Sequence, residues 1–482
     1  MIRPRLLVPA EDPSLAGRFA AIRVELDVAE EFPADVEAEA AEAARRGPDD
    51  ARLGVAGARA DLLDVPFVTI DPPGSTDLDQ AVHLERRPGG GYRVRYAIAD
   101  VAAFVRPGGA VDAEARRRGE TVYCPDRRIP LHPTVLSEGA ASLLPDGVRP
   151  AVVWTVDLDA SGEVVSADVR RASVRSREQL DYPAVQRALD SAGPADRDSL
   201  PVLLAEVGTA RSALERARGG VSLPRPEQEV VPDGDGWALE MRVSLPVEDH
   251  NAQISLLTGM VAARMMLDAG VGVLRTMPAA DAESLEHLRR RALALGVPWP
   301  EGTAYGDVLA SLDHGRTETA AFLVAATGLF RGAAWTTFHG APPTVVEHAA
   351  IAAPYAHVTA PLRRLVDRFG LEVCLAATAG AAVPGWVLDG LDGLGAQMAA
   401  GASRGSAVDR ACTDLVEASV LAPHVGRDWE AAALTEKTVQ LAQPPVVAGC
   451  DGPPLPIGRP VLVRLVEADL DTRSVRFAWD GA

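Results

Sequence analysis

Residues 67–80 read Phe67-Val-Thr-Ile-Asp71-Pro-Pro-Gly-Ser-Thr-Asp77-Leu-Asp79-Gln80, and this stretch decides the fold class and the candidate site. The apolar run that begins at Phe67 predicts a buried strand that ends at Asp71. The Pro-Pro-Gly-Ser sequence that follows predicts a turn, because proline fixes φ and glycine permits a positive φ. Asp77 and Asp79 are two positions apart, so in extended backbone their side chains project to the same side. We therefore expect a strand, a tight turn and a return segment that bring three carboxylates together.

Three carboxylates within nine residues repel one another unless a cation lies among them. Oxygen ligands of this kind suit Mg²⁺, with Mn²⁺ as the alternative. Aspartate is also common in turns for a structural reason, because its side chain hydrogen-bonds to the nearby backbone. The spacing alone leaves both interpretations open.

The predicted elements change in type along the chain. Short β-rich runs bounded by proline or glycine come first, at 67–70, 83–85, 92–99 and 151–158. Beyond about residue 200, apolar residues recur at three- and four-residue spacing and predict helices over 203–218, 253–269, 280–295, 361–377 and 403–421. After about residue 427, strands return at 437–441, 460–468 and 474–479 and predict a small barrel. Strands followed by helices within one unit predict an α+β fold.

The length of 482 residues is too large for one ordinary core and predicts a large central domain with smaller ones beside it. We expect a small N-terminal region at 1–64 that packs on the core and contains one short helix opened by Pro33. The central domain is expected at 65–426 and the barrel at 427–482.

Composition and charge narrow the class of protein. The apolar fraction of 47% and the charged fraction of 24% are those of a soluble globular protein. No stretch approaches a membrane span, and the N-terminus becomes acidic too soon for a secretory signal, so we expect a cytoplasmic protein without membrane contact. The net charge of −19 excludes a protein that coats nucleic acid with its whole surface, but it leaves room for a local basic channel. Four scattered cysteines predict neither a zinc site nor a disulfide framework.

The stretch from Asp71 to Gln80 resembles the motif of the ribonuclease II catalytic (RNB) domain, in which an Asp that ends a strand is followed by Asp-x-Asp-Asp. Asp71, Asp77 and Asp79 match the first three acids, and Gln80 stands where the family usually has the fourth. In that family the four acids hold Mg²⁺ around the scissile phosphate, so the resemblance implies this role for all four positions. An amide oxygen can ligate a cation but adds no negative charge. Further segments match in family order across residues 65–420, among them Ala97-Ile-Ala-Asp100-Val, Tyr123-Cys-Pro-Asp-Arg-Arg-Ile-Pro-Leu-His-Pro133, Gly219-Gly-Val-Ser-Leu223 and His348-Ala-Ala-Ile.

The segment Thr359-Ala-Pro361-Leu-Arg363-Arg364 resembles the family's Thr-Ser-Pro-Ile-Arg element. Pro361 fits the first turn of a helix, which would place Arg363 near the positive end of the helix dipole. An arginine is unfavourable there unless an anion is bound, so the resemblance implies that Arg363 clamps a phosphate, with Arg364 beside it as a second RNA contact. The alternative is an ion pair between Arg363 and Asp367, four residues on.

Three further residues take roles from the resemblance. Tyr123 corresponds to the tyrosine that stacks on the RNA near its 3′ end, and stacking tolerates any base. The opposing aromatic residue falls at Leu223, so we expect a weaker clamp. Asp409 lies where the family carries a catalytic Glu followed by Arg, but Ser406 and Asp409 also fit a helix capping box.

The resemblance implies a hydrolytic 3′-to-5′ exoribonuclease that degrades single-stranded RNA to nucleoside 5′-monophosphates with Mg²⁺. Asp79 is the expected essential acid, supported by Asp71 and Asp77, and Arg363 and Asp409 are the further expected catalytic residues. The C-terminal region is similar to the family's OB-type RNA-binding barrel, and the residues before Asp71 are too few for its paired cold-shock barrels. No obligatory protein partner is evident from the sequence. Two alternatives remain: a catalytically impaired homologue that binds RNA as a module, and a metal-dependent phosphoesterase that acts on small nucleotides.

Overall fold

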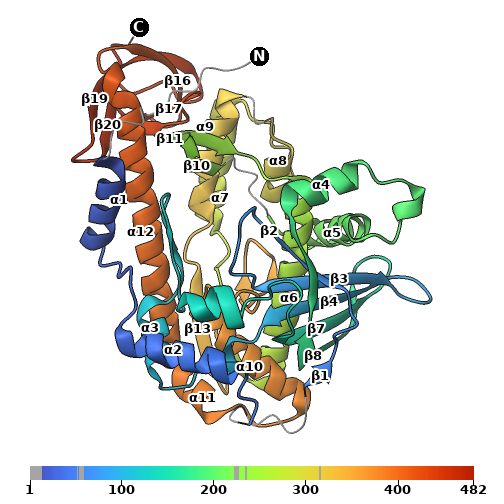
Figure 1. The fold of residues 1–482 in the computed structure, drawn as a ribbon. Helices are drawn as coiled ribbons and strands as arrows, with labels where there is room; N and C mark the ends of the chain where they lie inside the picture. Colours follow the sequence, from blue (N-terminus) through green and yellow to red (C-terminus); the bar gives the residue numbers. More distant parts are fainter. Residues whose placement is uncertain are drawn as a thin grey trace.

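The computed structural model describes residues 14–51, 53, 59–221, 227–233, 236–313 and 316–481, and it contains a seven-stranded sheet (Figure 1). The strand order is β1-β8-β7-β4-β3-β2-β9. Neighbouring strands are antiparallel except at the two edges, where β1 pairs with β8 and β9 pairs with β2 in parallel. The strands are β1 (Ala60–Asp61), β2 (Phe67–Asp71), β3 (Gln80–Arg86), β4 (Tyr92–Ala99), β7 (Arg149–Leu158), β8 (Val164–Val174) and β9 (Ser176–Asp181).

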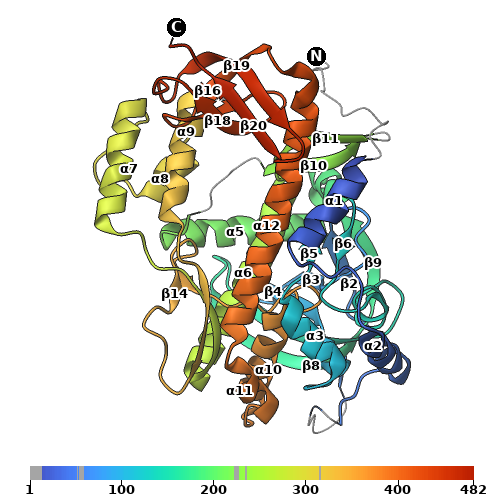
Figure 2. The same ribbon diagram turned by 90° about the vertical axis from the view of Figure 1, so that its left-hand side faces the viewer.

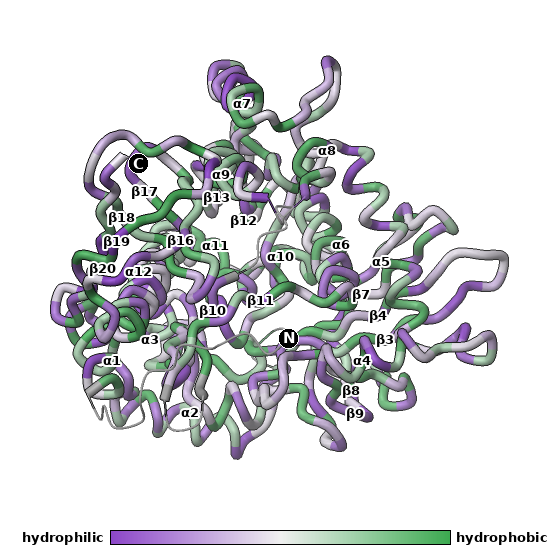
Figure 3. The backbone as a smooth tube through the Cα atoms, turned by 90° about the horizontal axis from the view of Figure 1, so that it is seen from above, coloured by the Kyte–Doolittle hydropathy of each residue, from purple (hydrophilic) through white to green (hydrophobic). Residues whose placement is uncertain are grey.

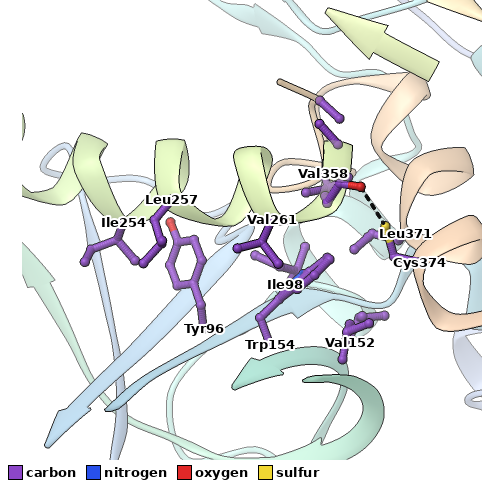
Figure 4. Packing of buried hydrophobic residues seen from close by; sticks show 14 of the residues in the cluster. Tyr96, Ile98, Val152, Trp154, Ile254, Leu257, Val261, Val358, Leu371 and Cys374 are labelled. Atoms are coloured by element: carbon purple, nitrogen blue, oxygen red, sulfur yellow. Dashed lines mark hydrogen bonds between the residues drawn. The ribbon is translucent and has the colours of Figure 1, made fainter. Parts of the chain in front are cut away.

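One face of the sheet packs against α6 (Pro246–Ala269), as Figure 4 shows. Leu257 and Val261 of this helix lie against Tyr96 and Trp154, which belong to the two central strands β4 and β7. Trp154 and Leu257 are fully buried, and burial of each large apolar side chain contributes roughly 1.5–3 kcal/mol. The same hydrophobic core includes residues of α5 (Leu200–Ala217), α10 (Leu365–Ala379) and α11 (Gly385–Leu391).

The other face of the sheet carries a second, smaller core. Val36 and Ala40 of α2 (Ala34–Arg46) pack there with Ala97 and Ala99 of β4. The side chain of Leu78 enters the same core and is fully buried. With both faces covered, the central strands are apolar on both sides, which explains their nearly continuous hydrophobic sequence.

A single long helix, α12 (Leu394–Leu421), runs from the region of α10 and α11 to the C-terminal barrel (Figures 1 and 2). Helix α1 (Ser14–Glu25) packs along it, and so does the short hairpin formed by β5 (Val122–Tyr123) and β6 (Arg128–Ile129). Phe19 of α1, Val122 of the hairpin and Cys412 of α12 share one buried apolar cluster. The helix therefore packs against both the N-terminal helix and the hairpin, and its C-terminal end leads into the barrel.

The C-terminal strands form a closed barrel in the order β16-β17-β18-β20-β19. Its strands are β16 (Asp428–Ala433), β17 (Thr438–Leu441), β18 (Val447–Asp451), β19 (Pro460–Asp469) and β20 (Ser474–Ala478). A separate apolar cluster links Leu434 of the barrel region to the helices α7 (Ala282–Leu295), α8 (Tyr305–Ala310) and α9 (Thr317–Ala326). Seen from above, α7 lies at the rim of the molecule with many hydrophilic residues (Figure 3).

Smaller elements complete the described chain: α3 (Ala110–Arg118), α4 (Tyr182–Asp190), and the antiparallel pairs β10 (Glu227–Asp233) with β11 (Gly236–Arg242), β12 (Val271–Thr276) with β13 (Ala334–His339), and β14 (Glu347–His348) with β15 (Ala353–Pro354). Among the helices described, none has both the length and the apolar character needed to cross a bilayer.

The architecture confirms the predicted α+β class with a C-terminal barrel. Three predicted helix starts are wrong, and one of them is that of α6, which begins at Pro246 rather than at residue 253. Helix α10 begins at Leu365 rather than at Pro361, because the residues from Pro361 to Arg363 form a turn. Helix α12 begins at Leu394, well before the predicted start at residue 403. Its glycines lower helix propensity, but they allow the backbone of a neighbouring segment to approach closely, and that packing overrides the propensity.

Gly401 of α12 is the clearest of these close approaches. A Cβ atom at this position would lie 2.9 Å from the carbonyl oxygen of Arg118 and 3.1 Å from the Cα atom of Gly119. We expect Gly401→Val to displace the segment that leads into β5 and to destabilise the fold by roughly 1–3 kcal/mol, the usual cost of overpacking. Thermal denaturation measures the effect. The exposed Ser403 of the same helix provides the control Ser403→Val, and an equal loss in both variants would show that helix propensity rather than close packing is responsible.

Candidate active site

The turn after β2 brings the return segment back alongside the strand. The amide of Ser75 donates to the carbonyl oxygen of Pro72 at 3.2 Å, and Gly74 has φ +80°, the conformation that only glycine adopts without strain. The turn predicted from Pro-Pro-Gly-Ser is therefore confirmed. It leaves Asp71 at the end of β2 and directs the chain towards Asp77.

The return segment is held in register by the loop around Ser142. The amide of Leu78 donates to Ser142 Oγ at 3.0 Å, and the amide of Leu143 donates to the Leu78 carbonyl oxygen at 3.0 Å. Because Leu78 is fully buried in the core, the alternating side chains of Asp77 and Asp79 project away from that core. Asp77 and Asp79 both lie within electrostatic range of Arg363, and Asp77 also influences the pKa of Asp79.

Asp79 is the most buried of the acids, with 2% of its surface exposed. Its Oδ1 accepts a hydrogen bond from the amide of Leu362 at 2.7 Å, and its Oδ2 lies 3.4 Å from Arg363 Nε. Burial raises the pKa of this carboxyl to about 8, although Arg363 and the Leu362 amide favour the charged form. The buried charge is thus only partly compensated by its protein partners.

Asp71 and Asp77 lie close enough to interact electrostatically with each other and with Arg363. Burial raises the pKa of Asp71 to about 6, the nearby Asp77 raises it further, and Arg363 opposes the shift. Its Oδ2 is buried without a hydrogen-bond partner. The pKa of Asp77 is also raised by burial, against the opposing effect of Arg128, which forms an ion pair with Asp77 Oδ1.

Arg128 and Glu138 were not among the residues predicted from sequence. Arg128 of β6 also donates to Thr76 Oγ1 at 2.9 Å and to Glu138 Oε1 at 2.7 Å, so it fastens the return segment and orients Asp77. The segment from Tyr123 to Pro133 had been matched to the family for its tyrosine alone. No local sequence signal marks this arginine, because it lies far from Asp77 along the chain.

Gln80 begins β3, and its side-chain amide nitrogen donates to the carbonyl oxygen of Thr359. This hydrogen bond ties the strand to the segment that carries Arg363. An ionised carboxylate in the same place has no proton to donate, so the family's usual acid could not make this hydrogen bond. Only the amide oxygen of Gln80 remains chemically able to ligate a cation.

Arg363 is held beside the acids by backbone pairing rather than by a helix end. The amide of Thr121 donates to the Arg363 carbonyl oxygen at 3.0 Å, and the amide of Leu365 donates to the Gly119 carbonyl oxygen at 3.0 Å. Since α10 starts only at Leu365, the expectation that Pro361 opens the helix is wrong.

The alternative pairing of Arg363 with Asp367 is also wrong. Asp367 instead accepts two hydrogen bonds from Arg364, at 2.9 Å from Nε and 2.7 Å from Nη2, and one from the Ala360 amide at 2.6 Å. Arg364 and the Ala360 amide are thus held together by Asp367, and this shared partner stabilises the turn. The Arg363 side chain is 45% exposed and remains available to an anion.

Tyr123 lies at the end of β5, next to the backbone segment that pairs with Arg363. Its side chain is 52% exposed. Partial burial and the neighbouring Asp77 and Asp79 raise its pKa, while Arg363 opposes the shift, so the ring lies within electrostatic range of the whole cluster. Leu223, the predicted opposing residue, lies outside the described residues.

Asp409 lies in the middle of α12 and is exposed. The capping-box alternative is wrong, because Ser406 and Asp409 both lie well inside a helix that begins at Leu394. Among the interactions of the described residues, none joins Asp409 to the three acids. Its role as a catalytic acid therefore stays a prediction.

The three acids have the chemistry that a divalent cation requires. They supply hard oxygen donors, burial raises the pKa of each, and one Asp71 oxygen lacks a partner. Such a set favours a cation such as Mg²⁺, which would stabilise the charged forms. Within the described part of the chain, however, no three His, Cys, Asp or Glu side chains lie close enough together to hold a metal ion as placed. The acids fit the cation in chemistry, and their side chains would have to turn towards one another to ligate it.

The raised pKa of Asp79 predicts that the metal-free fold loses stability as the pH rises. Below about pH 4 this carboxyl is protonated in both the folded and the unfolded state. Between that value and the folded-state pKa of about 8, only the unfolded state ionises, so rising pH favours unfolding.

We therefore expect Asp79→Asn to raise the melting temperature in EDTA near the folded-state pKa, by the equivalent of roughly 1–3 kcal/mol. The difference should vanish towards acidic pH. Asp389→Asn changes an exposed acid and is the control. An Asp79 variant that melts with the wild type across the whole pH range would contradict the assignment of an uncompensated buried charge.

Comparison with known proteins places this geometry in a family. The chain matches the RNB domain over residues 59–370 and the RNase II-type exonuclease C-terminal S1 domain over residues 429–479. It is 30% identical over 351 residues to Ribonuclease R of Escherichia coli (strain K12), a match that covers 70% of this chain and 42% of that protein. The chain thus spans less than half the length of that relative.

Solved structures show the same fold. The structure titled Mycoplasma genitalium RNase R in complex with ribose methylated single-stranded RNA superposes with a TM-score of 0.84 at 18% identity, over 97% of this chain and 78% of that chain. Yeast Ssd1, described as a pseudonuclease, superposes with a TM-score of 0.69 at 14% identity, over 95% of this chain and 59% of that chain. Since the RNB match extends over more than half of the sequence and the fold agrees, the chain belongs to the RNB exoribonuclease family.

Proposed function

We propose that this protein is a hydrolytic 3′-to-5′ exoribonuclease that degrades single-stranded RNA to nucleoside 5′-monophosphates with Mg²⁺. One observation carries the proposal. Asp79 Oδ2 lies 3.4 Å from Arg363 Nε although the two residues are far apart in the sequence, and Asp71, Asp77 and Tyr123 all lie within electrostatic range of the same arginine. Acids for a cation, an arginine for phosphate and an exposed aromatic ring for a base are the groups that a sequence-tolerant nuclease needs.

Asp71, Asp77 and Asp79 would hold the cation. When bound, it would polarise the scissile phosphate and lower the pKa of an attacking water. Asp79 is the essential acid in this proposal, because its position is set by two contacts, the Leu362 amide and Arg363. Asp77 is oriented by Arg128, which positions the acid without needing to touch the substrate.

Arg363 would clamp the phosphate of the terminal nucleotide. Its guanidinium is half-exposed and its backbone is fixed by the pairing with Thr121, so the side chain can turn to an anion while its base stays in place. A planar guanidinium suits bidentate phosphate contacts. Tyr123 would stack on a base nearby, which contributes about 1–3 kcal/mol per base without selecting among sequences.

A second candidate function is RNA binding without cleavage. It is favoured by Gln80, because this residue lacks the negative charge of the family's fourth acid and its amide nitrogen donates a hydrogen bond to the Thr359 carbonyl oxygen. The barrel at the C-terminus belongs to the S1 type and would contact RNA in either case. Nothing in the described geometry favours a phosphoesterase for small nucleotides, which becomes one outcome of the activity test.

Two labelled oligoribonucleotides separate these functions. We expect a 5′-labelled single strand to shorten stepwise and a 3′-labelled one to release labelled mononucleotide at once, with Mg²⁺ and not with EDTA. Asp79→Asn should lower the rate by more than roughly 10–100-fold, the usual loss when a group that only supports a metal ligand is removed, while Asp389→Asn retains activity. Binding without cleavage under any divalent metal would replace the proposal with the RNA-binding function. Hydrolysis confined to short nucleotides would indicate the phosphoesterase.

Gln80→Asp separates the two roles of that side chain. The variant restores the family's fourth acid but leaves the Thr359 carbonyl oxygen facing a negative charge instead of a donor. We expect a lower melting temperature in EDTA, by the equivalent of about 1–3 kcal/mol, and a larger gain in melting temperature on adding Mg²⁺ than the wild type shows. Gln80→Asn keeps a neutral, shorter amide and should lower stability without enlarging the Mg²⁺ effect. A Mg²⁺ response equal to that of the wild type in Gln80→Asp would mean that position 80 takes no part in cation binding.

A further inference from the structure

Two of the four cysteines, which are scattered in the sequence, meet in the fold. Cys124 directly follows β5, and Cys412 lies on α12. Both side chains pack in one apolar cluster and each thiol shifts the pKa of the other, so the two groups lie close together. Cys412 is 1% exposed in the apolar cluster between α1, α12 and the β5–β6 hairpin, and Cys124 packs on the edge of that cluster with part of its surface open. Both are free thiols.

The surroundings make the two thiols unequal. The neighbouring Cys412 thiol and the Arg23 guanidinium lower the pKa of Cys124, whereas the Cys124 thiol and burial raise the pKa of Cys412. Arg23 is itself 1% exposed and fixed by Glu30 at 2.7 Å and Asp126 at 2.8 Å, so its charge stays beside the hairpin. Thiolate character and access decide the reactivity of a cysteine, and Cys124 combines both with a second thiol in reach.

The other two cysteines lack this arrangement. Cys374 Sγ contacts the carbonyl oxygen of Ala262 at 3.7 Å within the main core (Figure 4), and Cys450 Sγ contacts the carbonyl oxygen of Asp451 at 3.7 Å in the barrel. Burial raises the pKa of both. They provide internal references for any thiol reaction.

We propose that Cys124 and Cys412 form a peroxide-responsive dithiol that closes to a disulfide and fastens the β5–β6 hairpin to α12. The Cys124 thiolate attacks hydrogen peroxide, so that an S–O bond forms, the O–O bond breaks and the departing hydroxide takes a proton to become water. The Cys412 thiol then attacks that sulfur, the S–S bond forms, the S–O bond breaks and a second water leaves with its proton. Two thiols lose two electrons and two protons, and one peroxide is reduced to two waters.

The hairpin that would be fastened carries Tyr123 and Arg128, which flank Cys124 in the sequence. A disulfide holds its sulfur atoms at about 2 Å, closer than any thiol hydrogen bond, so closure draws the hairpin towards α12. This second half of the inference rests on the proposed function. Because Tyr123 is the proposed base-stacking residue, closure should weaken binding of single-stranded RNA by about threefold to tenfold, a part of what one stacked base contributes.

The chemical half is tested on the full chain by mass spectrometry. After treatment with equimolar hydrogen peroxide, we expect the intact protein to lose two hydrogens and a non-reducing digest to contain one peptide pair that links Cys124 to Cys412, reversed by dithiothreitol. In Cys412→Ala the cross-link should disappear and Cys124 should be trapped as sulfenic acid by dimedone. If the wild type yields no such pair, or if Cys124 reacts no faster than Cys374 and Cys450, the proposal is overturned. The wild-type result does not depend on whether the variant folds.

The binding half uses fluorescence anisotropy with a labelled single-stranded oligoribonucleotide in EDTA, on reduced and oxidised protein. Weaker binding by the oxidised form, restored by dithiothreitol and absent in Cys412→Ala, supports the switch. Cross-linked protein that binds RNA as tightly as the reduced form overturns the switch and leaves the proposed function intact. Reduced protein that does not bind RNA overturns the proposed function, and the dithiol is then judged on the mass spectrum alone.

Discussion

The contact between Asp79 and the turn that contains Leu362 and Arg363 joins the two halves of the site. The acid comes from the return segment beside the sheet, and the turn precedes helix α10. A carboxylate with 2% exposure is costly to ionise unless positive charge reaches it, and the Leu362 amide and Arg363 supply only part of that charge. This deficit supports the proposal that a cation binds at the site, and it is the reason why the metal-free fold is expected to lose stability as the pH rises.

The rest of the site consists of supports that keep this contact in place. Gln80 links β3 to Thr359, Asp367 holds Arg364 and the Ala360 amide, and the backbone near Thr121 pairs with Arg363. Each support joins segments that are far apart in the sequence. Such groups act on catalysis only through the position of others, which is why the supports are as necessary to the geometry as the acids.

Local rules predicted the parts of the structure that depend on neighbouring residues. The strand from Phe67 and the turn at Gly74 both follow from the apolar run, the prolines and the glycine within one short segment. The start of α12 could not be predicted in this way, because its glycines disfavour a helix until Gly401 is packed against a distant backbone. For the same reason the ion pair of Arg128 with Asp77 and the meeting of Cys124 with Cys412 were beyond reach, since no periodicity encodes which distant segments touch. Family resemblance supplied Arg363 and Tyr123, whereas the periodicity and the proline rule misplaced the helix start at Pro361, whose turn is set by the contacts of Asp367.

Helix α12 has a mechanical consequence. It is 28 residues long, contacts α1 and the hairpin along its length, and is joined to the first barrel strand by only the short segment from Ala422 to Arg427. An α-helix bends little over such a length, so a rotation of the barrel moves the far end of the same rod. A force on RNA bound at the barrel would therefore be transmitted through α12 to the hairpin that carries Tyr123. Tension in the RNA strand would then act on the residue proposed to stack on its last base.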